Sequence, residues 1–243
     1  MNEVALRVDG LKKQNGRFLL DIENFSVAFG SIVGLVGKNG AGKTTFLNII
    51  AGRSRFDEGS LLFSDELRAG GNDEIACVFD QPDIDGLFCA RDIDMVFRNL
   101  YQGWSSDEFF SYIDMFGIDC DKRIVDMSRG MKTKAMLSIG LSHDARLLLL
   151  DEVTSGIDPY TKNDMLRVIR SYVLEKNAAA VLSSHIMSDL DCAADFCAVL
   201  SLGSLVLFDS VAEIKEAAGS LSMEEYLVSL GRGCVCDDER LGS

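Results

Sequence analysis

The sequence predicts an α/β fold with a mostly parallel sheet. Continuous apolar runs, typical of strands that are buried on both faces, occur at 32–36, 147–150 and 178–182. Amphipathic segments with helical spacing alternate with these runs, for example at 161–176. Because a strand–helix–strand unit places its two strands in parallel, this alternation predicts a largely parallel sheet with helices on both faces.

The individual elements follow from local patterns in the first half of the chain. An antiparallel β subdomain is expected at the N-terminus, from strands at 4–8 and 18–22 joined by a polar turn at 14–16. A helix is expected from about Lys43 until Gly52 ends it. Two more strands are expected at 60–63 and 74–80, and helices at 91–102 and 106–116, the second capped by Ser105 or Ser106.

The second half continues the alternation. Strands are expected at 147–150, 178–183, 197–200 and 205–208, and the last two form a pair that turns at Gly203. The expected helices span 127–141, 161–176, 211–218 and 222–230.

The most informative motif is a glycine-rich segment between the first buried strand and the helix after it. Residues 37–45 read G-K-N-G-A-G-K-T-T and match the pattern G-x-x-x-x-G-K-[ST] in its strand-to-helix setting. The glycines let successive backbone N–H groups point at phosphate oxygens, while Lys43 reaches the β- and γ-phosphates and the Thr44 hydroxyl ligates Mg²⁺. The expected nucleotide-binding residues are Gly37, Lys38, Asn39, Gly40, Ala41, Gly42, Lys43, Thr44 and Thr45.

Polar side chains follow two other buried strands. Asp151 and Glu152 end the run of four leucines, and His185 comes directly after the strand at 178–183. Ligands of parallel sheets bind at the carboxyl ends of the strands, so these side chains are expected in one crevice. Asp151 is suited to hold Mg²⁺, Glu152 to activate the water that attacks the γ-phosphate, and His185 to bind that phosphate.

Composition narrows the kinds of partner. The formal net charge of −14, without a cluster of Lys or Arg, argues against nucleic acid, since a phosphate-backbone binder needs a basic face. Apolar runs are too short to cross a bilayer and the first residues lack the features of a signal peptide, so no direct membrane insertion is expected. Seven scattered cysteines fit reduced thiols in the cytoplasm.

The order of these motifs resembles that of the ATP-binding subunits of ABC transporters, over essentially the whole chain, 1–243, as one domain. Residues 37–45 resemble the Walker A motif of a RecA-like P-loop NTPase core, and 147–152 resemble Walker B with its catalytic glutamate. Gln81 stands where this family has the Q-loop glutamine, which senses Mg²⁺ and the γ-phosphate. The segment at 127–131 resembles the signature motif and 155–158 the D-loop, which implies nucleotide contacts from Ser128, Gly130 and Asp158.

The same resemblance implies how the protein works. ATP would lie between Walker A of one copy and the signature of the other, in a head-to-tail homodimer or a pseudo-dimer with a related ATP-binding subunit. A transmembrane permease subunit would hold the chain on the inner face of the cell membrane, contacting an inserted helical subdomain at about 84–135. The form S-R-G-M-K and the segment at 222–227 resemble bacterial exporter subunits that are encoded separately from their permease.

Two departures and two alternatives accompany this interpretation. Arg129 and Met131 stand where the signature usually has Gly and Gln, and Asn15 stands where many relatives have an aromatic that stacks on adenine, with Phe18 the nearest aromatic.

One alternative is a soluble ABC-type ATPase without a transporter. The other is a GTPase switch, because 83–86 match D-x-x-G and 161–164 approximate N-K-x-D.

The aromatic-rich segment at 88–116 suggests a docking patch if its rings are exposed. Phe97, Tyr101 and Trp104 are its candidate contacts with a partner.

Overall fold

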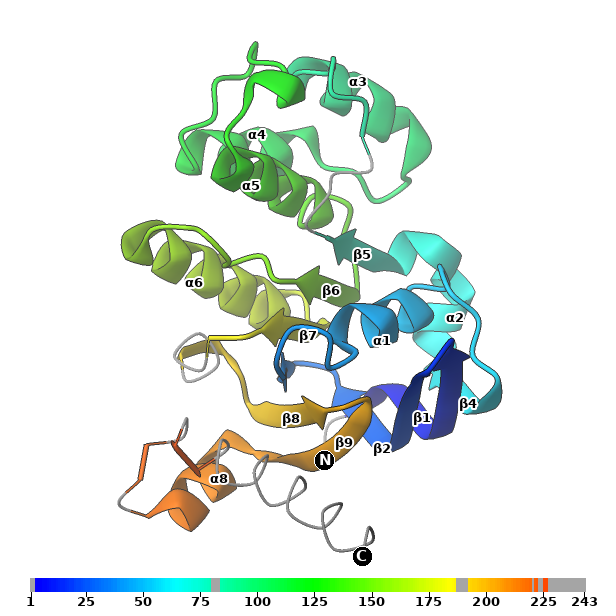
Figure 1. Cartoon of the computed structure of the whole chain (residues 1–243). Helices are drawn as coiled ribbons and strands as arrows, with labels where there is room; N and C mark the ends of the chain where they lie inside the picture. The colour runs from blue at the N-terminus through cyan, green and yellow to red at the C-terminus, as the bar shows by residue number, and fades with distance from the viewer. Residues whose placement is uncertain (1–2, 80–83, 187–191, 220, 223–224, 227–243) are drawn as a thin grey trace, which may run out of the picture.

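The computed structural model describes residues 3–79, 84–186, 192–219, 221–222 and 225–226 (Figure 1). Within these residues, nine strands form one sheet in the order β4-β1-β2-β9-β8-β3-β7-β6-β5. The strands are β1 (Val4–Asn15), β2 (Phe18–Ala28), β3 (Ile32–Val36), β4 (Glu58–Phe63), β5 (Ile75–Val78), β6 (Leu147–Asp151), β7 (Ala179–Ser184), β8 (Phe196–Ser201) and β9 (Ser204–Ser210).

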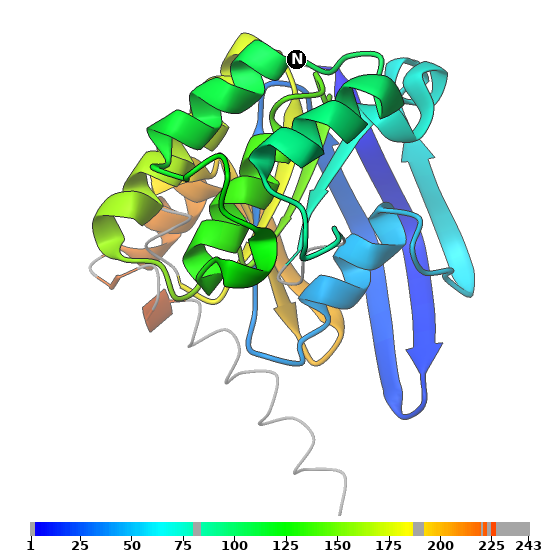
Figure 2. The ribbon, with the colours of Figure 1, turned by 90° about the horizontal axis from the view of Figure 1, so that it is seen from above.

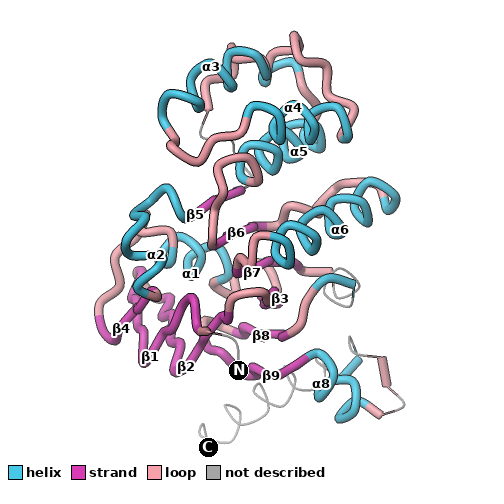
Figure 3. The backbone as a smooth tube through the Cα atoms, turned by 180° about the vertical axis from the view of Figure 1, so that it is seen from behind, coloured by secondary structure: helices cyan, strands magenta, loops and turns pink. Residues whose placement is uncertain are grey.

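Helices cover this sheet and extend beyond one edge of it. They are α1 (Lys43–Ile50), α2 (Asp65–Gly70), α3 (Ala90–Leu100), α4 (Ser106–Met115), α5 (Arg129–Gly140), α6 (Pro159–Glu175) and α8 (Val211–Ala218), with 3-10 turns η1 (Gly71–Glu74) and η2 (Ile124–Asp126). Seen from the front and from behind, α3, α4 and α5 gather beyond β5 at one end of the molecule (Figures 1 and 3). No described helix is long and apolar enough to cross a membrane.

The sheet has a parallel part and an antiparallel part. Strands β8, β3, β7, β6 and β5 run parallel, whereas β1 pairs antiparallel with both β2 and β4. Strand β9 joins the two parts, since it is antiparallel to β8 and meets β2 at the pair Asp21 and Ser204. The predicted α/β fold class, with a mostly parallel core and an N-terminal antiparallel subdomain, is therefore confirmed.

Each central strand contributes to two hydrophobic cores because its alternate side chains point to opposite faces. Leu147 and Leu149 pack on the face that carries α1 and strands β1 and β2, and Leu148 and Leu150 pack on the face with α5 and α6. From above, the long β1–β2 hairpin runs beside α1 (Figure 2). Burial on both faces is the reason that these strands are continuous apolar runs rather than alternating ones.

The boundaries of two predicted helices shift because of their caps. Helix α5 begins at Arg129 rather than 127, since Ser128 Oγ accepts a hydrogen bond from the Met131 N–H at 3.3 Å. Helix α6 begins at Pro159, where Asp158 Oδ1 accepts from the Thr161 N–H at 3.0 Å. Helix α2 was not predicted, because six residues are too few to show a helical period. Most of the predicted helix at 222–230 lies outside the described residues.

The aromatic rings of the 88–116 segment stack on one another. Phe97 lies 5.5 Å from Tyr101 and 5.4 Å from Trp104, measured between ring centroids, and all three are half-buried. The Trp104 Nε1–H donates to Asp94 Oδ1 at 2.9 Å, so this buried carboxylate has a partner. These rings therefore pack the helices together and are not the exposed contacts that the sequence suggested.

His143, only 6% exposed, lies at the base of this aromatic cluster. Its ring centroid is 4.6 Å from that of Tyr101, and its Nδ1 lies 3.1 Å from the Ile139 carbonyl oxygen. A carbonyl only accepts, so Nδ1 carries the proton, and Nε2 is buried without a hydrogen-bond partner among the described residues. Burial lowers the pKa of His143, because a charged imidazole loses its hydration there.

We expect the free energy of unfolding to fall as the pH is lowered from about 7 to about 5.5. In the unfolded chain a histidine has an ordinary pKa of about 6.5, so below that pH the unfolded state binds more protons than the folded state. The loss is at most about 1.4 kcal/mol per pH unit and continues until the lowered folded pKa is reached. Denaturant unfolding across this range measures it. His143→Asn keeps a donor for Ile139 but does not titrate; if its pH dependence equals that of the unmodified protein, the assignment to His143 is wrong.

Candidate functional site

The glycine-rich loop lies between β3 and α1, as the motif requires, and two of its glycines, Gly37 and Gly42, have no room for a side chain. Gly42 has φ +112°, and a Cβ there would lie 2.9 Å from Leu20 and 3.0 Å from the Phe18 ring. A Cβ on Gly37 would lie 2.5 Å from the Leu200 carbonyl oxygen. The loop is also held from the β8–β9 turn, where the Gly203 N–H donates to the Ala41 carbonyl at 3.1 Å. The backbone of the glycine-rich loop is therefore closely packed against the strands and the turn beside it.

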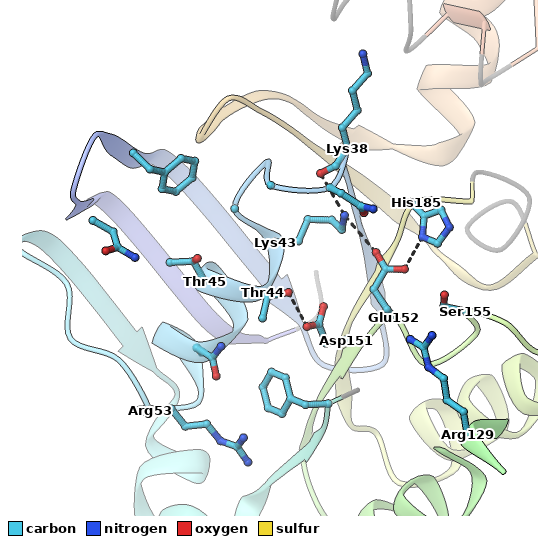
Figure 4. A pocket seen from close by; sticks show the side chains of 17 residues that line it. Lys38, Lys43, Thr44, Thr45, Arg53, Arg129, Asp151, Glu152, Ser155 and His185 are labelled. Atoms are coloured by element: carbon cyan, nitrogen blue, oxygen red, sulfur yellow. Dashed lines mark hydrogen bonds and ion pairs between the residues drawn. The ribbon is translucent and has the colours of Figure 1, made fainter. Parts of the chain in front are cut away.

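Lys43 opens α1 and is only 5% exposed. Its Nζ donates to the Gly37 carbonyl at 2.7 Å and lies 3.2 Å from Glu152 Oε1 (Figure 4). A buried ammonium needs such partners because it has lost its hydration. The contact with Glu152 joins the glycine-rich loop directly to the end of β6.

Thr44 and Asp151 form the second contact between the loop and β6. The Thr44 hydroxyl donates to Asp151 Oδ2 at 2.7 Å, and the Ser183 hydroxyl donates to Asp151 Oδ1 at 2.5 Å. Mg²⁺ prefers oxygen ligands and usually takes only one or two carboxylates from a protein. A buried carboxylate that faces a hydroxyl beside a phosphate-binding loop is such a set, so Thr44 and Asp151 fit the metal predicted from the sequence.

Glu152 has a left-handed backbone, with φ +53°, which is unusual for a residue that has a Cβ. Its N–H donates to both the carbonyl and the hydroxyl of Ser183, at 3.2 and 3.0 Å. Its carboxylate touches Lys43 through Oε1 and lies 2.5 Å from His185 Nδ1 through Oε2 (Figure 4). Backbone strain of this kind persists where the surroundings enforce it, often at functional sites.

These residues line one pocket of about 800 Å³ at the carboxyl ends of β3, β6 and β7. Lys38, Asn39, Gly40, Gly42 and Thr45 line it together with Lys43, Thr44, Asp151, Glu152 and His185. The lining residues that sequence reasoning did not assign to the site are Asn48, Arg53, Phe79, Arg129 and Ser155. These five residues do not share a motif that would have marked them as site residues. The helical period could have indicated Asn48, since it lies one turn beyond Thr44 on the same face of α1.

Arg53 and Phe79 form one end of this pocket. The Arg53 guanidinium carbon lies 4.4 Å from the centroid of the Phe79 ring, which makes a cation–π contact between the residues after α1 and after β5. Arg129 extends from the start of α5 toward Glu152 and Ser155 (Figure 4). The pocket thus has basic side chains at its edges in addition to Lys43.

Several predicted site residues lie elsewhere. Ser128 and Asp158 cap α5 and α6, and neither they nor Gly130 line the pocket of their own chain. Gln81 lies outside the described residues. Thr161 and Asp164, the residues of the GTPase alternative, belong to α6 and line a different pocket of about 310 Å³ beside α4 and α5. The structure therefore does not bring that segment to the phosphate loop.

The fold and this pocket define a P-loop nucleoside triphosphatase. The family described as "ABC transporter" matches residues 20–155, and the chain belongs to this family, whose ATP-binding domains bind and hydrolyse ATP. The family and the ATPase activity expected from the sequence are confirmed.

Three relatives illustrate the breadth of the family. The chain is 31% identical over 224 residues to the lantibiotic transport ATP-binding protein SrtF of Streptococcus pyogenes, covering 90% of this chain and 94% of that protein. It is 26% identical over 212 residues to the bacitracin transport ATP-binding protein BcrA of Bacillus licheniformis, with 85% and 69% covered. It is 29% identical over 215 residues to the Nod factor export ATP-binding protein I of Rhizobium sp. (strain N33), with 84% and 70% covered.

Solved structures show the same fold. An ATP-binding subunit of an ABC transporter superposes with a TM-score of 0.81 at 23% identity, covering 93% of this chain and 99% of the other. A dimeric ATP-binding cassette in a post-hydrolysis state, bound to ADP and Pi, superposes with a TM-score of 0.73 at 17% identity, with 85% and 98% covered.

We expect weak discrimination between ATP and GTP. The triphosphate contacts do not read the base, and Asn15, which lines the pocket, offers no ring for stacking. Phe18 also lines the pocket, but an aromatic ring stacks on guanine as well as on adenine. The two affinities should lie within about tenfold, or about 1.4 kcal/mol, in competition binding. A preference for ATP beyond roughly a hundredfold would mean that the base has a specific contact, and Phe18→Ala would then test whether Phe18 supplies it.

Proposed function

We propose that the chain is the ATP-hydrolysing subunit of an exporter, which dimerises head to tail on ATP and drives a separate transmembrane permease. The observation that carries the proposal is the meeting of Lys43, Glu152 and His185 at the carboxyl ends of three parallel strands. The names of the relatives, which include lantibiotic transport, bacitracin transport and Nod factor export, support a role in export.

Nucleotide binding would rearrange the ion pairs of the pocket. The loop N–H groups and Lys43 would hold the phosphates, so that Lys43 exchanges the Glu152 carboxylate for phosphate oxygens. Thr44 and Asp151, with Gln81, would hold Mg²⁺, which neutralises charge on the β- and γ-phosphates when bound. Glu152, no longer paired with Lys43, would then be available as a base.

Hydrolysis would use Glu152 as the base for the attacking water and His185 as the partner of the Glu152 carboxylate. Glu152 would accept the proton of the water as its oxygen bonds to the γ-phosphorus, while the bond from that phosphorus to the β-phosphate oxygen breaks and ADP leaves. His185, whose Nδ1 faces Glu152, would orient that carboxylate, and with a proton on each ring nitrogen it would also donate from Nε2 to a γ-phosphate oxygen. Glu152 has a left-handed backbone, and its carboxylate lies 3.2 Å from Lys43 Nζ of the loop helix.

Glu152→Gln should lower ATP turnover by about 100-fold or more, since the amide keeps the size of the side chain but cannot accept the proton. ATP should still bind, and a closed dimer should accumulate. Phosphate release and gel filtration with ATP measure these two effects. Glu108→Gln is a matched control, because Glu108 also pairs with a lysine, Lys176 at 3.2 Å, but lies outside the pocket. Near-normal turnover of Glu152→Gln would exclude Glu152 as the base.

The proposed dimer is supported by motif residues that do not line the pocket of their own chain. Ser128, Gly130 and Asp158 belong to the motifs that resemble the signature and the D-loop, yet none of them lines the pocket of the same chain. One chain alone would therefore lack donors on one side of the γ-phosphate, and chemistry would require closure with a second copy or a related subunit.

Mixing two inactive variants tests this geometry. Ser128→Ala should leave ATP binding to the monomer almost unchanged but reduce turnover, and Lys43→Ala should abolish binding to its own loop. In a mixed dimer both defects fall on the same nucleotide, which leaves the other site intact. Turnover recovered on mixing supports the head-to-tail dimer. Absence of recovery at every ratio, with mixed dimers shown to form, contradicts it.

The membrane partner would be a transmembrane permease, which would place the chain in the cytoplasm at the inner face of the cell membrane. We assign its contact to the helical subdomain at about 84–135. The rings of Phe97, Tyr101 and Trp104 are half-buried, whereas Met95 and Leu100 on α3 are 57% and 63% exposed. Leu87, before α3, is 62% exposed. Exposed apolar side chains that gather on one element often mark a protein interface.

The double substitution Met95→Ser and Leu100→Ser should keep ATPase activity in solution, because exposed positions usually change stability by less than about 0.5 kcal/mol. It should prevent co-purification with the transmembrane partner. Leu174→Ser, at a residue of α6 that is 56% exposed, is the control and should keep that association. If the unmodified chain binds no membrane protein at all, a soluble ABC-type ATPase is the better interpretation.

A further inference from the structure

We propose that Ser183 is a positioning residue for ATP hydrolysis, whose one buried hydroxyl holds both Asp151 and Glu152 in their working positions. The part of the proposal that concerns Glu152 rests on the proposed function, and the part that concerns Asp151 does not require Glu152 to be the base.

Ser183 lies opposite Asp151 in the parallel pairing of β7 with β6 and is 0% exposed. Its hydroxyl donates to Asp151 Oδ1 at 2.5 Å and accepts from the Glu152 N–H at 3.0 Å. A hydroxyl has only one proton. Since the N–H of Glu152 occupies a lone pair of this oxygen, the proton is directed to the carboxylate of Asp151. Both bonds therefore depend on one atom.

The first consequence is the orientation of the Asp151 carboxylate. The Ser183 hydroxyl occupies Oδ1, and this fixes the rotation of the carboxylate so that Oδ2 faces Thr44 Oγ1 at 2.7 Å. Without this hydroxyl, the hydrogen bond with Thr44 is the one that the described residues still offer this carboxylate, which can then rotate about its Cβ–Cγ bond. A metal ligand held by a second hydrogen bond is better oriented, and loss of such a partner typically weakens metal binding 10- to 100-fold.

The second consequence is the backbone of Glu152. A left-handed conformation is disfavoured for a residue with a Cβ, and Glu152 has φ +53°. Its N–H is held by both acceptors of Ser183, the carbonyl at 3.2 Å and the hydroxyl at 3.0 Å. Removal of the hydroxyl leaves the Glu152 N–H with the Ser183 carbonyl alone, at the point where the chain leaves β6. The carboxylate of Glu152 then loses its fixed position between Lys43 and His185.

Ser138 and Ser142, the other serines with 0% exposure in the described part of the chain, make no such connections. Ser138, also 0% exposed, donates to the Lys134 carbonyl at 2.9 Å within its own helix α5. This is the ordinary local bond of a serine in a helix, and it joins no functional residues. Ser183 instead links side-chain and backbone groups of two consecutive site residues on the neighbouring strand. Ser138 therefore provides a matched control for the loss of a buried hydroxyl.

The experiment compares Ser183→Thr with Ser183→Val, two side chains of the same shape of which only threonine has a hydroxyl, together with Ser183→Ala and Ser138→Ala. Displacement of a fluorescent ATP analogue by ATP is measured with Mg²⁺ and with a chelator, and kcat and KM are measured separately. Thermal unfolding shows which variants fold.

We expect Ser183→Val and Ser183→Ala to bind ATP normally, within about twofold, in the chelator. Their gain in ATP affinity on adding Mg²⁺ should shrink about tenfold or more, and their kcat should fall about 10- to 100-fold. Ser183→Thr and Ser138→Ala should resemble the unmodified protein in both respects. The Thr and Val pair remains decisive if the smaller Ala variant fails to fold.

Equal behaviour of the Thr and Val variants overturns the proposal, because the hydroxyl would then have no role. A uniform loss of affinity with and without Mg²⁺ also overturns it, since that result indicates packing alone. Failure of the proposed function is distinguishable: if Glu152→Gln keeps normal turnover while Ser183→Val still loses its response to Mg²⁺, the role of Ser183 at Asp151 stands and that of Glu152 as the base does not.

Discussion

The parallel pairing of β3, β7 and β6 is the constraint on which the site depends. Val36 lies beside Ser184 and Asp151 beside Ser183, so the carboxyl ends of the three strands meet at one edge of the sheet. The glycine-rich loop, the two carboxylates and His185 follow these ends directly. They converge because the register of the sheet places them together, although Lys43 and Glu152 are more than a hundred residues apart in the sequence.

Within this site the buried ammonium of Lys43 is paired with the carboxylate of Glu152. Lys43 is buried, and its partners are the Gly37 carbonyl and the Glu152 carboxylate. In the proposed function a bound nucleotide would exchange these contacts for phosphate oxygens, and this exchange would also release Glu152. Binding and activation would therefore be two results of one rearrangement, because both depend on the same ion pair.

The two sides of the molecule have different tasks in the proposed function. The double-sided core beneath the pocket is rigid, since alternate leucines of β6 pack into separate hydrophobic clusters. The helices beyond β5 carry Ser128 at one end of α5 and exposed apolar residues on α3. Through this unit, closure on ATP at one surface would be transmitted to a membrane partner at another.

The sequence by itself determined the fold class, the phosphate loop and which buried strands end in polar residues, because each of these depends on local patterns. A buried parallel strand is an apolar run, and a loop that surrounds phosphate must contain glycine at positions such as Gly42, where no Cβ fits. Asp151, Glu152 and His185 were predicted as site residues for a similar reason, since each stands at or just after the end of such a strand.

Only the tertiary structure decided which groups touch. The sequence contains no sign that Ser183 joins Asp151 to Glu152, that Arg53 lies on Phe79, or that the Gly203 turn supports Ala41. The half-buried state of Phe97, Tyr101 and Trp104 was equally invisible, because an aromatic residue has the same letter whether its ring packs inward or faces solvent. These contacts join residues that are distant in sequence, and their geometry arises from the register of the strands and the packing of helices, which no local pattern contains.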